Sequence, residues 1–241
     1  MTFGSLFAGI GGFDLGFERA GLECKWQVEI DDYATRVLEK HWPNVRRWRD
    51  VRDFPPEPVS EWRVDVIAGG FPCQDISNAG KRAGLSGERS GLWREFARII
   101  RHLRPRYVVV ENVAALLERG IGGVLADLAA LGFNAEWEVL PACAFGAPHA
   151  RERVFLIAYP NGSQLRASGA NQAEGWPANL PVDGIGSARQ VGNWWSTEPE
   201  PCSVVYGVPG IVDRLRPYGN AVVPAVAQWI GERILANEVG E

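Results

Sequence analysis

Cys73 is the residue whose type and surroundings point most directly to covalent chemistry. It stands in the segment 69–74 (GGFPCQ), directly after an apolar run at 64–68 that predicts a buried strand. Ligands of open α/β sheets bind at the carboxyl ends of such strands, so the thiol lies where chemistry is expected. Pro72 fixes its own φ and restricts the residue before it, so we expect a stiff backbone to present the thiol. The alternative is a buried structural cysteine, which is our prediction for Cys24, Cys143 and Cys202.

A carboxylate and two arginines are the next candidates for chemistry. The strand expected at 107–110 leads into Glu111, which places its carboxyl group on the same sheet edge as Cys73. A carboxyl group kept protonated in a dry pocket can donate to a ring nitrogen, although an acid at a helix N-terminus also fits this position. Arg151 and Arg153 stand two residues apart on an expected extended segment and therefore point to one side. One could reach a carbonyl oxygen of a base while the other supports the pocket, or both could be ordinary charges at a strand entry.

A glycine-rich turn near the start of the chain is typical of a cofactor site. The segment 8–12 (AGIGG) separates a short apolar run from a helical pattern, and glycines there let the backbone approach a ligand closely. The spacing is not G-x-G-x-x-G, because Asp14 occupies the last position, and this disfavours a nicotinamide dinucleotide. Glu29 ends the next expected strand, where a ribose-binding acid belongs, and Asp50 could take an adenine amino group. The set indicates a nucleoside cofactor; the alternative is a plain tight turn with surface acids.

The elements that must position these groups alternate along the chain. This alternation predicts βαβ units and a mainly parallel sheet, and hence the α/β class. Residues 160–210 are rich in Gly, Pro, Ser and Asn without a helical or strand period, so we expect a small irregular domain or insertion there. The expected strands are 3–8, 24–29, 64–68, 107–110, 133–140 and 154–158, and the expected helices are 13–20, 31–41, 92–103, 122–131 and 222–236.

The composition is that of an ordinary soluble globular protein, with 46% hydrophobic and 22% charged residues among 241. We expect no membrane span, because no run of about 18 apolar residues occurs. We expect no signal peptide either, because the start of the chain lacks positive charge and a cleavage site. The four cysteines form no C-x-x-C pair, so we expect no metal site and reduced thiols in a cytoplasm.

The net charge of −4 argues weakly against a nucleic-acid partner, but the distribution of charge points the other way. Between Lys81 and Arg106 eight basic residues stand against two acidic ones. A stretch of this kind can contact phosphates beside Cys73, or it can be the solvated face of a helix.

Taken together, these motifs resemble the DNA cytosine-5 methyltransferase family. The resemblance implies a Rossmann-like, S-adenosylmethionine-dependent methyltransferase sheet with a small irregular target-recognition insertion. It implies a catalytic and cofactor-binding domain at 1–159, completed by 211–241, and a target-recognition region at 160–210. The matching pieces occur in the family's order: LFAGIGGFDLGFERAG (6–21), Glu29, Asp50, GGFPCQDISNAGKRAGLSGERSGLW (69–93), ENV (111–113), RERVFLIA (151–158) and YGNAVVP (218–224).

The resemblance also implies a role for each group. Cys73 would add to C6 of a cytosine flipped out of double-stranded DNA, Glu111 would handle N3 and Arg153 would hold O2, with Arg151 as a fourth catalytic residue. Gln74, Ser77, Lys81, Arg82 and Arg89 would contact DNA from a mobile loop. The residues expected to bind S-adenosylmethionine are Phe7, Ala8, Gly9, Ile10, Gly11, Gly12, Glu29, Ile30, Asp50, Val51, Pro72, Asn220, Ala221 and Val222.

The family further implies a cytoplasmic monomer, encoded by a bacterium or a phage, without a metal. Two alternatives stay open at this point: a methyltransferase of the same fold acting on tRNA cytosine, and a non-catalytic DNA-binding relative. The complete set of Cys73, Glu111 and Arg153 argues against the second. A nicotinamide-dependent dehydrogenase is disfavoured by the glycine spacing and leaves Cys73 without a role.

Overall fold

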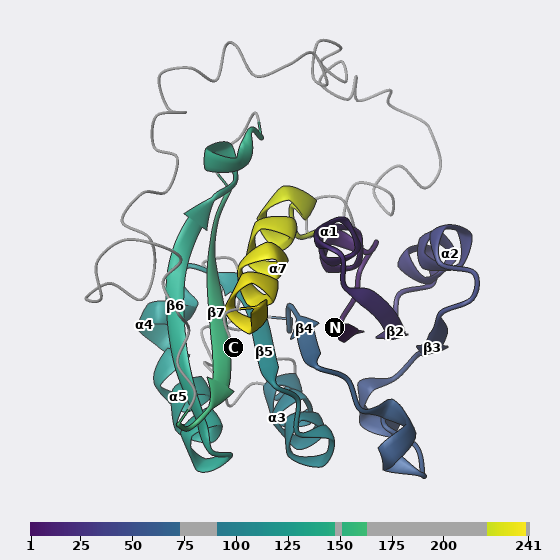
Figure 1. Cartoon of the computed structure of the whole chain (residues 1–241), viewed down its shortest axis with the longest axis horizontal. Coiled ribbons are helices and arrows are strands. Elements are labelled where there is room, and N and C mark those ends of the chain that lie inside the picture. Colours follow the sequence, from purple (N-terminus) through teal and green to yellow (C-terminus); the bar gives the residue numbers. More distant parts are fainter. Residues whose placement is uncertain (73–90, 148–150, 163–220, 240–241) are drawn as a thin grey trace.

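The computed structural model describes residues 1–72, 91–147, 151–162 and 221–239. Within these residues a seven-stranded sheet with the order β3-β2-β1-β4-β5-β7-β6 forms the centre of the molecule (Figure 1). Neighbouring strands are parallel from β3 to β5, and β7 runs antiparallel to both β5 and β6. The predicted α/β fold with a mainly parallel sheet is therefore confirmed. The strands are β1 (Thr2–Leu6), β2 (Glu23–Val28), β3 (Arg46–Trp48), β4 (Val66–Gly69), β5 (Tyr107–Val113), β6 (Phe133–Pro141) and β7 (Glu152–Pro160).

Helices cover both faces of this sheet, because successive strand residues point to opposite sides. One apolar core joins the sheet to α3 and α5, and a second joins its other face to α1 and α7. In β5, for example, Val108 and Val110 enter the first core while Val109 enters the second. The α-helices are α1 (Gly12–Ala20), α2 (Asp32–His41), α3 (Leu92–Leu103), α4 (Leu116–Arg119), α5 (Ile121–Ala130) and α7 (Pro224–Val239), and the 3-10 helices are η1 (Val51–Asp53), η2 (Val59–Trp62) and η4 (Ala142–Phe145).

The first and last helices lie side by side on one face of the sheet (Figure 1). Glycines allow this approach: a Cβ atom on Gly16 would lie 2.5 Å from the Cβ atom of Ala227, and one on Gly231 would lie 2.8 Å from that of Ala20. Because any side chain at these glycines would force the helices apart, α1 and α7 form one packed unit.

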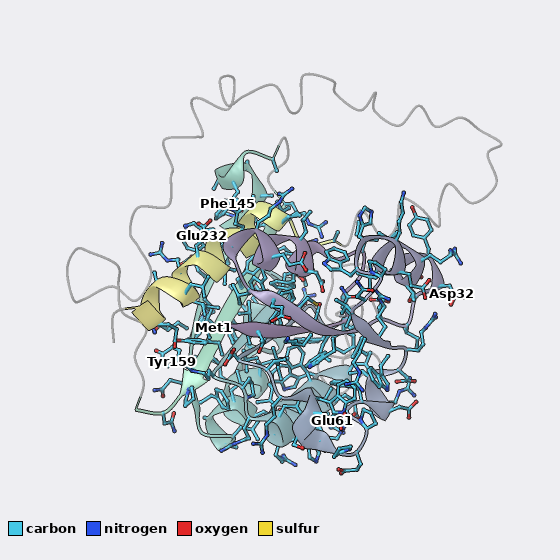
Figure 2. The ribbon with its side chains drawn as sticks, turned by 45° about the vertical axis from the view of Figure 1, so that its right-hand side comes forward. Met1, Asp32, Glu61, Phe145, Tyr159 and Glu232 are labelled. Carbon is cyan, nitrogen blue, oxygen red and sulfur yellow. The ribbon has the colours of Figure 1, made fainter. Side chains whose placement is uncertain are left out.

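The antiparallel strands β6 and β7 form a long hairpin that carries η4 near its tip (Figure 1). Phe145 of η4 packs edge-on against Trp229 of α7, with ring centroids 5.7 Å apart. Figure 2 labels Phe145 close to Glu232 of α7, so the hairpin tip and the last helix lie together. The hairpin therefore links the far edge of the sheet to the α1–α7 unit.

The predicted elements match the structure within a few residues at each end, with one consequential difference. Strand β5 does not stop at residue 110 but runs to Val113, because β7 pairs with it as far as that residue. Glu111 therefore lies inside a strand and not at the N-terminus of a helix. Among the described residues, no helix is long and apolar enough to cross a bilayer.

Candidate active site

The turn after β1 has the backbone that its glycines predict. Phe7, Gly9 and Gly11 all have left-handed backbone, with φ values of 53°, 57° and 88°. This conformation carries little strain only for glycine. A Cβ atom on Gly9 would meet no other atom within 4 Å, so the turn leaves open space above this residue. The open side of the turn can admit a ligand.

The other two glycines of the turn are explained by packing within the protein. A Cβ atom on Gly11 would lie 2.5 Å from the Trp42 ring, and one on Gly12 would lie 2.3 Å from the carbonyl oxygen of Val222. Their small size lets neighbouring chain segments close around the turn, whether or not a ligand also touches them.

Glu29 is held beside this turn at the end of β2. One of its carboxylate oxygens accepts a hydrogen bond from the backbone N–H of Gly9 at 2.7 Å, and the other accepts one from Asp31 N at 2.8 Å. Burial raises the pKa of this carboxyl group, and the backbone donors oppose that rise. A carboxylate offers about four acceptor positions, so Glu29 is oriented and still has capacity for two hydroxyl donors.

The other residues expected at the cofactor differ in how much side chain they expose. Ile30 is 62% exposed directly beside Glu29, which suits stacking of an apolar ring face. Val51 is only 5% exposed, so only its backbone is available to a ligand. Asp50 caps η1 through a 2.9 Å hydrogen bond from Arg52 N. Arg98 of α3 fixes the same segment by donating to the carbonyl oxygen of Val51 at 2.9 Å.

A buried polar network under the turn escaped the sequence analysis. Asp14 is fully buried and accepts hydrogen bonds from Gln27 Nε2 at 2.8 Å, Ser5 Oγ at 3.2 Å and Cys24 Sγ at 3.5 Å. Burial raises the pKa of Asp14 to about 6. Gln27 in turn accepts from Arg47 Nε at 2.8 Å, so the network joins β1, α1, β2 and β3 beneath the turn. A charged residue on the buried face of an expected helix was the one available signal.

The buried carboxylate of Glu111 and the partly exposed Arg153 form an ion pair on adjacent strands. Arg153 Nε lies 3.1 Å from Glu111 Oε1, and Glu111 is 8% exposed. Burial raises the pKa of Glu111 to about 7, while Arg153 and then Arg151 act to lower it. A carboxyl group with this pKa is present in both protonation states near neutral pH, as a general acid and base requires.

The chain segment that leads to Cys73 is pressed against this pair. A Cβ atom on Gly70 would lie 2.6 Å from Glu111 Oε2, so any larger residue here would displace the Glu111 carboxylate. Asn112 Nδ2 donates to the carbonyl oxygen of Phe71 at 3.1 Å and fastens the segment to β5. No local pattern predicts this role of Asn112, although it belongs to the ENV motif. Pro72 is described, whereas Cys73, Gln74, Ser77, Lys81, Arg82, Arg89 and Asn220 lie outside the described residues.

The C-terminal segment joins the same site from the other side. Arg151 Nη2 donates to the carbonyl oxygen of Ala221 at 3.1 Å. A small pocket lies between this segment and the ion pair, lined by Glu111, Leu140, Ala142, Arg151, Arg153, Phe155, Val222, Val223 and Val226. The structure thus places Glu111, Arg151 and Arg153 around one pocket. The extended segment expected for both arginines is wrong for Arg151, which lies in the loop before β7 with a φ of 24°.

The basic stretch is only partly available for phosphate contacts. Arg98 binds carbonyl oxygens of the segment at η1, Arg104 donates to the carbonyl oxygen of Leu131 at 2.7 Å, and Arg106 pairs with Glu238. Arg104 and Arg106 precede the amino end of β5, at the sheet edge opposite to Glu111. The prediction of phosphate contacts is therefore wrong for these three arginines, because their side chains bind groups within the protein. The sequence does not reveal this, since basic residues at the start and at the end of a helix look alike.

Two further predictions concern cysteines and metals. Cys24 is buried, as predicted for a structural cysteine, whereas Cys143 is half-buried and Cys202 lies outside the described residues. In the part of the chain that the structure describes, no group of three His, Cys, Asp or Glu side chains could hold a metal ion.

Comparison with known proteins shows that this chain is similar to methyltransferases. A family model described as C-5 cytosine-specific DNA methylase matches residues 1–184. The type II methyltransferase M.NgoFVII of Neisseria gonorrhoeae is 36% identical over 157 residues, which are 64% of this chain and 42% of the relative. M.Eco47II of Escherichia coli is 39% identical over 167 residues, covering 65% of this chain and 39% of the relative. The chain thus spans less than half the length of these two curated relatives.

Solved structures show the same likeness. An Escherichia coli prophage protein described as a DNA modification methyltransferase superposes with a TM-score of 0.59 at 28% identity, covering 70% of this chain and 49% of that chain. DNMT2 of Spodoptera frugiperda gives a TM-score of 0.58 at 22% identity, covering 71% and 53%. The second likeness shows a shared fold alone.

Proposed function

Because the chain belongs to the C-5 cytosine-specific DNA methylase family, we propose that it is a DNA cytosine-5 methyltransferase with S-adenosylmethionine as methyl donor. The observation that carries the proposal is the ion pair between the buried Glu111 and Arg153, with the backbone of Gly70 close to the Glu111 carboxylate. Gly70 precedes Cys73 by three residues, and we propose that the Cys73 thiol acts beside this acid and this cation. A thiol, an acid and a cation are three of the groups that methylation of cytosine C5 needs.

The described residues of the cofactor half fit S-adenosylmethionine. Open space above Gly9, the oriented carboxylate of Glu29 and the exposed side chain of Ile30 match a ribose with two hydroxyl groups and an adenine ring. Phe7, Ala8, Ile10, Gly11, Gly12, Asp50, Val51, Pro72, Asn220, Ala221 and Val222 complete the proposed binding set. When bound, S-adenosylmethionine supplies the methyl group that the base takes up.

Cytosine C5 is a poor nucleophile, so the reaction needs covalent help. In the proposed mechanism the Cys73 thiolate adds to C6, which breaks the C5=C6 π bond and moves its electron pair toward N3 and O2. Glu111 donates its proton to N3 and Arg153 donates a hydrogen bond to O2, so the ring carries no full negative charge. The resulting C5 is nucleophilic enough to accept a methyl group.

The cycle closes by elimination. A base removes the proton from C5, the C5=C6 bond forms again, and Cys73 leaves as a thiolate while N3 returns its proton to Glu111. The pKa of about 7 that burial gives Glu111 suits both directions of this transfer.

A base inside a stacked duplex cannot reach a thiol in a pocket, so the cytosine must be flipped out. Gln74, Ser77, Lys81, Arg82 and Arg89 are proposed to contact the DNA, and the region 160–210 is proposed to read its sequence. We further propose that the domain 1–159, completed by 211–241, acts as a cytoplasmic monomer without a metal.

The deciding experiment is transfer of a labelled methyl group to duplex DNA or to tRNA by the full chain. We expect label in DNA only, and bisulfite sequencing of that DNA then gives the recognised sequence. Cys73→Ser should abolish transfer, whereas the matched control Cys143→Ser, in η4, should retain it. Label in tRNA alone would refute the choice of substrate, and unchanged turnover in Cys73→Ser would refute the covalent step.

A trapping experiment tests the adduct directly. DNA with 5-fluorocytosine in the recognised sequence should yield a covalent complex under turnover conditions, because fluorine cannot leave C5 as a proton does. Absence of a complex with wild-type protein that methylates ordinary DNA would contradict the proposed adduct at C6.

A further inference from the structure

A short segment before α7, 221–223, contacts both halves of the proposed site. A Cβ atom on Gly12 would lie 2.3 Å from the carbonyl oxygen of Val222, so this backbone rests directly on the start of α1. On its other side, Ala221 accepts the 3.1 Å hydrogen bond from Arg151. One segment therefore touches both the glycine turn and an arginine of the base-handling site.

The segment and the glycine turn belong to one packed unit. A Cβ atom on Gly16 would lie 2.5 Å from the carbonyl oxygen of Pro224, so α1 also fixes the residue that starts α7. Close-packed interiors transmit small displacements instead of absorbing them. A change at the glycine turn therefore reaches the Ala221 carbonyl group.

Arg151 also lies near Glu111 and acts on it through its charge. Both side chains line the same small pocket, and the charge of Arg151 acts on Glu111 second only to that of Arg153. Arg151 is half-buried and has an unusual φ of 24°, which other packed groups must hold in place. A shift of its guanidinium group changes the field at Glu111, and with it the protonation of that carboxyl group.

We propose that Arg151 is a positioning residue that couples the cofactor segment 221–223 to Glu111. The inference rests on the proposed function and deepens it, because occupation of the glycine turn then adjusts the acid that handles the base. Arg153, on the paired strand, holds Glu111 directly, whereas Arg151 acts from the loop before β7 and joins two units of the fold.

The test measures proton exchange when S-adenosylhomocysteine, the demethylated cofactor, binds to the full chain. Calorimetry at pH 7 in two buffers of different ionisation enthalpy gives the number of protons exchanged. Glu29 and Asp14 near the turn are present in every variant, so the difference in proton exchange between the wild type and Glu111→Gln measures the part due to Glu111. We expect Arg151→Gln to lose the same part of the proton exchange as Glu111→Gln. We also expect it to weaken S-adenosylhomocysteine binding at least about fivefold, which is the lower end of typical coupling between sites.

The matched control is Arg101→Gln, an exposed arginine near the end of α3 that should behave as wild type. Arg151→Lys keeps the charge and should keep part of the proton exchange, and thermal melts of each variant report whether it is folded. Wild-type proton exchange in folded Arg151→Gln, or in Glu111→Gln, would overturn the coupling alone. Failure of the wild-type chain to bind S-adenosylhomocysteine would overturn the proposed function together with it.

Discussion

Replacing Glu111 by glutamine should change the pH dependence of stability: relative to the wild type, the variant should gain stability as the pH rises. Burial raises the pKa of Glu111 from the ordinary value of 4.5 to about 7 in the folded chain. For a group whose folded pKa is raised, stability is complete below the unfolded pKa and is lost as the pH rises through the folded pKa. Glutamine cannot ionise, so the variant does not undergo this loss.

The interval between the two pKa values sets the size of the effect. At 1.36 kcal/mol for each pKa unit, the interval from 4.5 to about 7 corresponds to about 3 kcal/mol. Most of this change falls between pH 5 and pH 7. For a chain of this size, each kcal/mol moves the melting temperature by roughly 2–4 °C. The melting temperature of Glu111→Gln relative to that of the wild type should therefore rise by roughly 6–12 °C over this pH range.

Thermal melts of the wild type and of Glu111→Gln at pH 5 and pH 8.5 measure the change. Any cost of leaving Arg153 without its anion is the same at both pH values for the variant, so the difference between the two conditions isolates the titration. Glu39→Gln removes an exposed carboxylate of α2 and is the matched control, for which we expect no such growth. An equal melting-temperature difference at both pH values would refute the reasoning.

Three further substitutions test other parts of the site. Gly70→Ala would place a Cβ atom 2.6 Å from Glu111 Oε2, so turnover should fall at least about tenfold with little change in cofactor affinity. The control is Gly122→Ala, where a Cβ atom would meet no other atom within 4 Å. This control should leave turnover unchanged and raise stability by about 1 kcal/mol. Equal turnover in the two variants would contradict the close fit. Gly9→Ala should cost about 1–2 kcal/mol of stability from its left-handed backbone, and calorimetry should show S-adenosylhomocysteine binding weakened about tenfold; unchanged binding would mean that the space above Gly9 is not the cofactor site. Tyr107→Phe removes the hydroxyl group that forms hydrogen bonds with Glu238 and Asn237 at 2.8 Å each. The loss of these bonds should lower stability by about 1 kcal/mol without affecting turnover. A loss of turnover in a kinetic assay would show that the amino edge of the sheet matters for the reaction.

The parts of the fold that sequence predicts well are those with a regular apolar pattern and a cap. Helix α3 has its predicted bounds because Trp93, Phe96, Ile100 and Leu103 recur at helical spacing and enter one core. Asp31 was predicted as the N-cap of α2, and its side chain accepts a hydrogen bond from Ala34 N at 2.9 Å. In these elements local propensity and tertiary packing point to the same structure.

The sequence is less informative where tertiary contacts override local character. Two polar residues, Glu111 and Asn112, look like the end of a strand, yet pairing with β7 carries β5 past both. Asp14 is a charged residue, yet three donors and complete burial make it part of the support under the glycine turn. The contact between Arg151 and Ala221 joins positions 70 residues apart, and no local pattern marks it.

The pairing of α1 with α7 also has a consequence for synthesis of the chain. Roughly 200 residues separate the two helices in the sequence. At about 5–20 residues per second, the ribosome needs roughly 10–40 s to synthesise these intervening residues. During that time Phe13 and Phe17 of α1 have no α7 to cover them, although both are buried in the finished fold. A nascent chain in this state exposes an apolar sheet face, so we expect chains that end before residue 224 to be prone to aggregation.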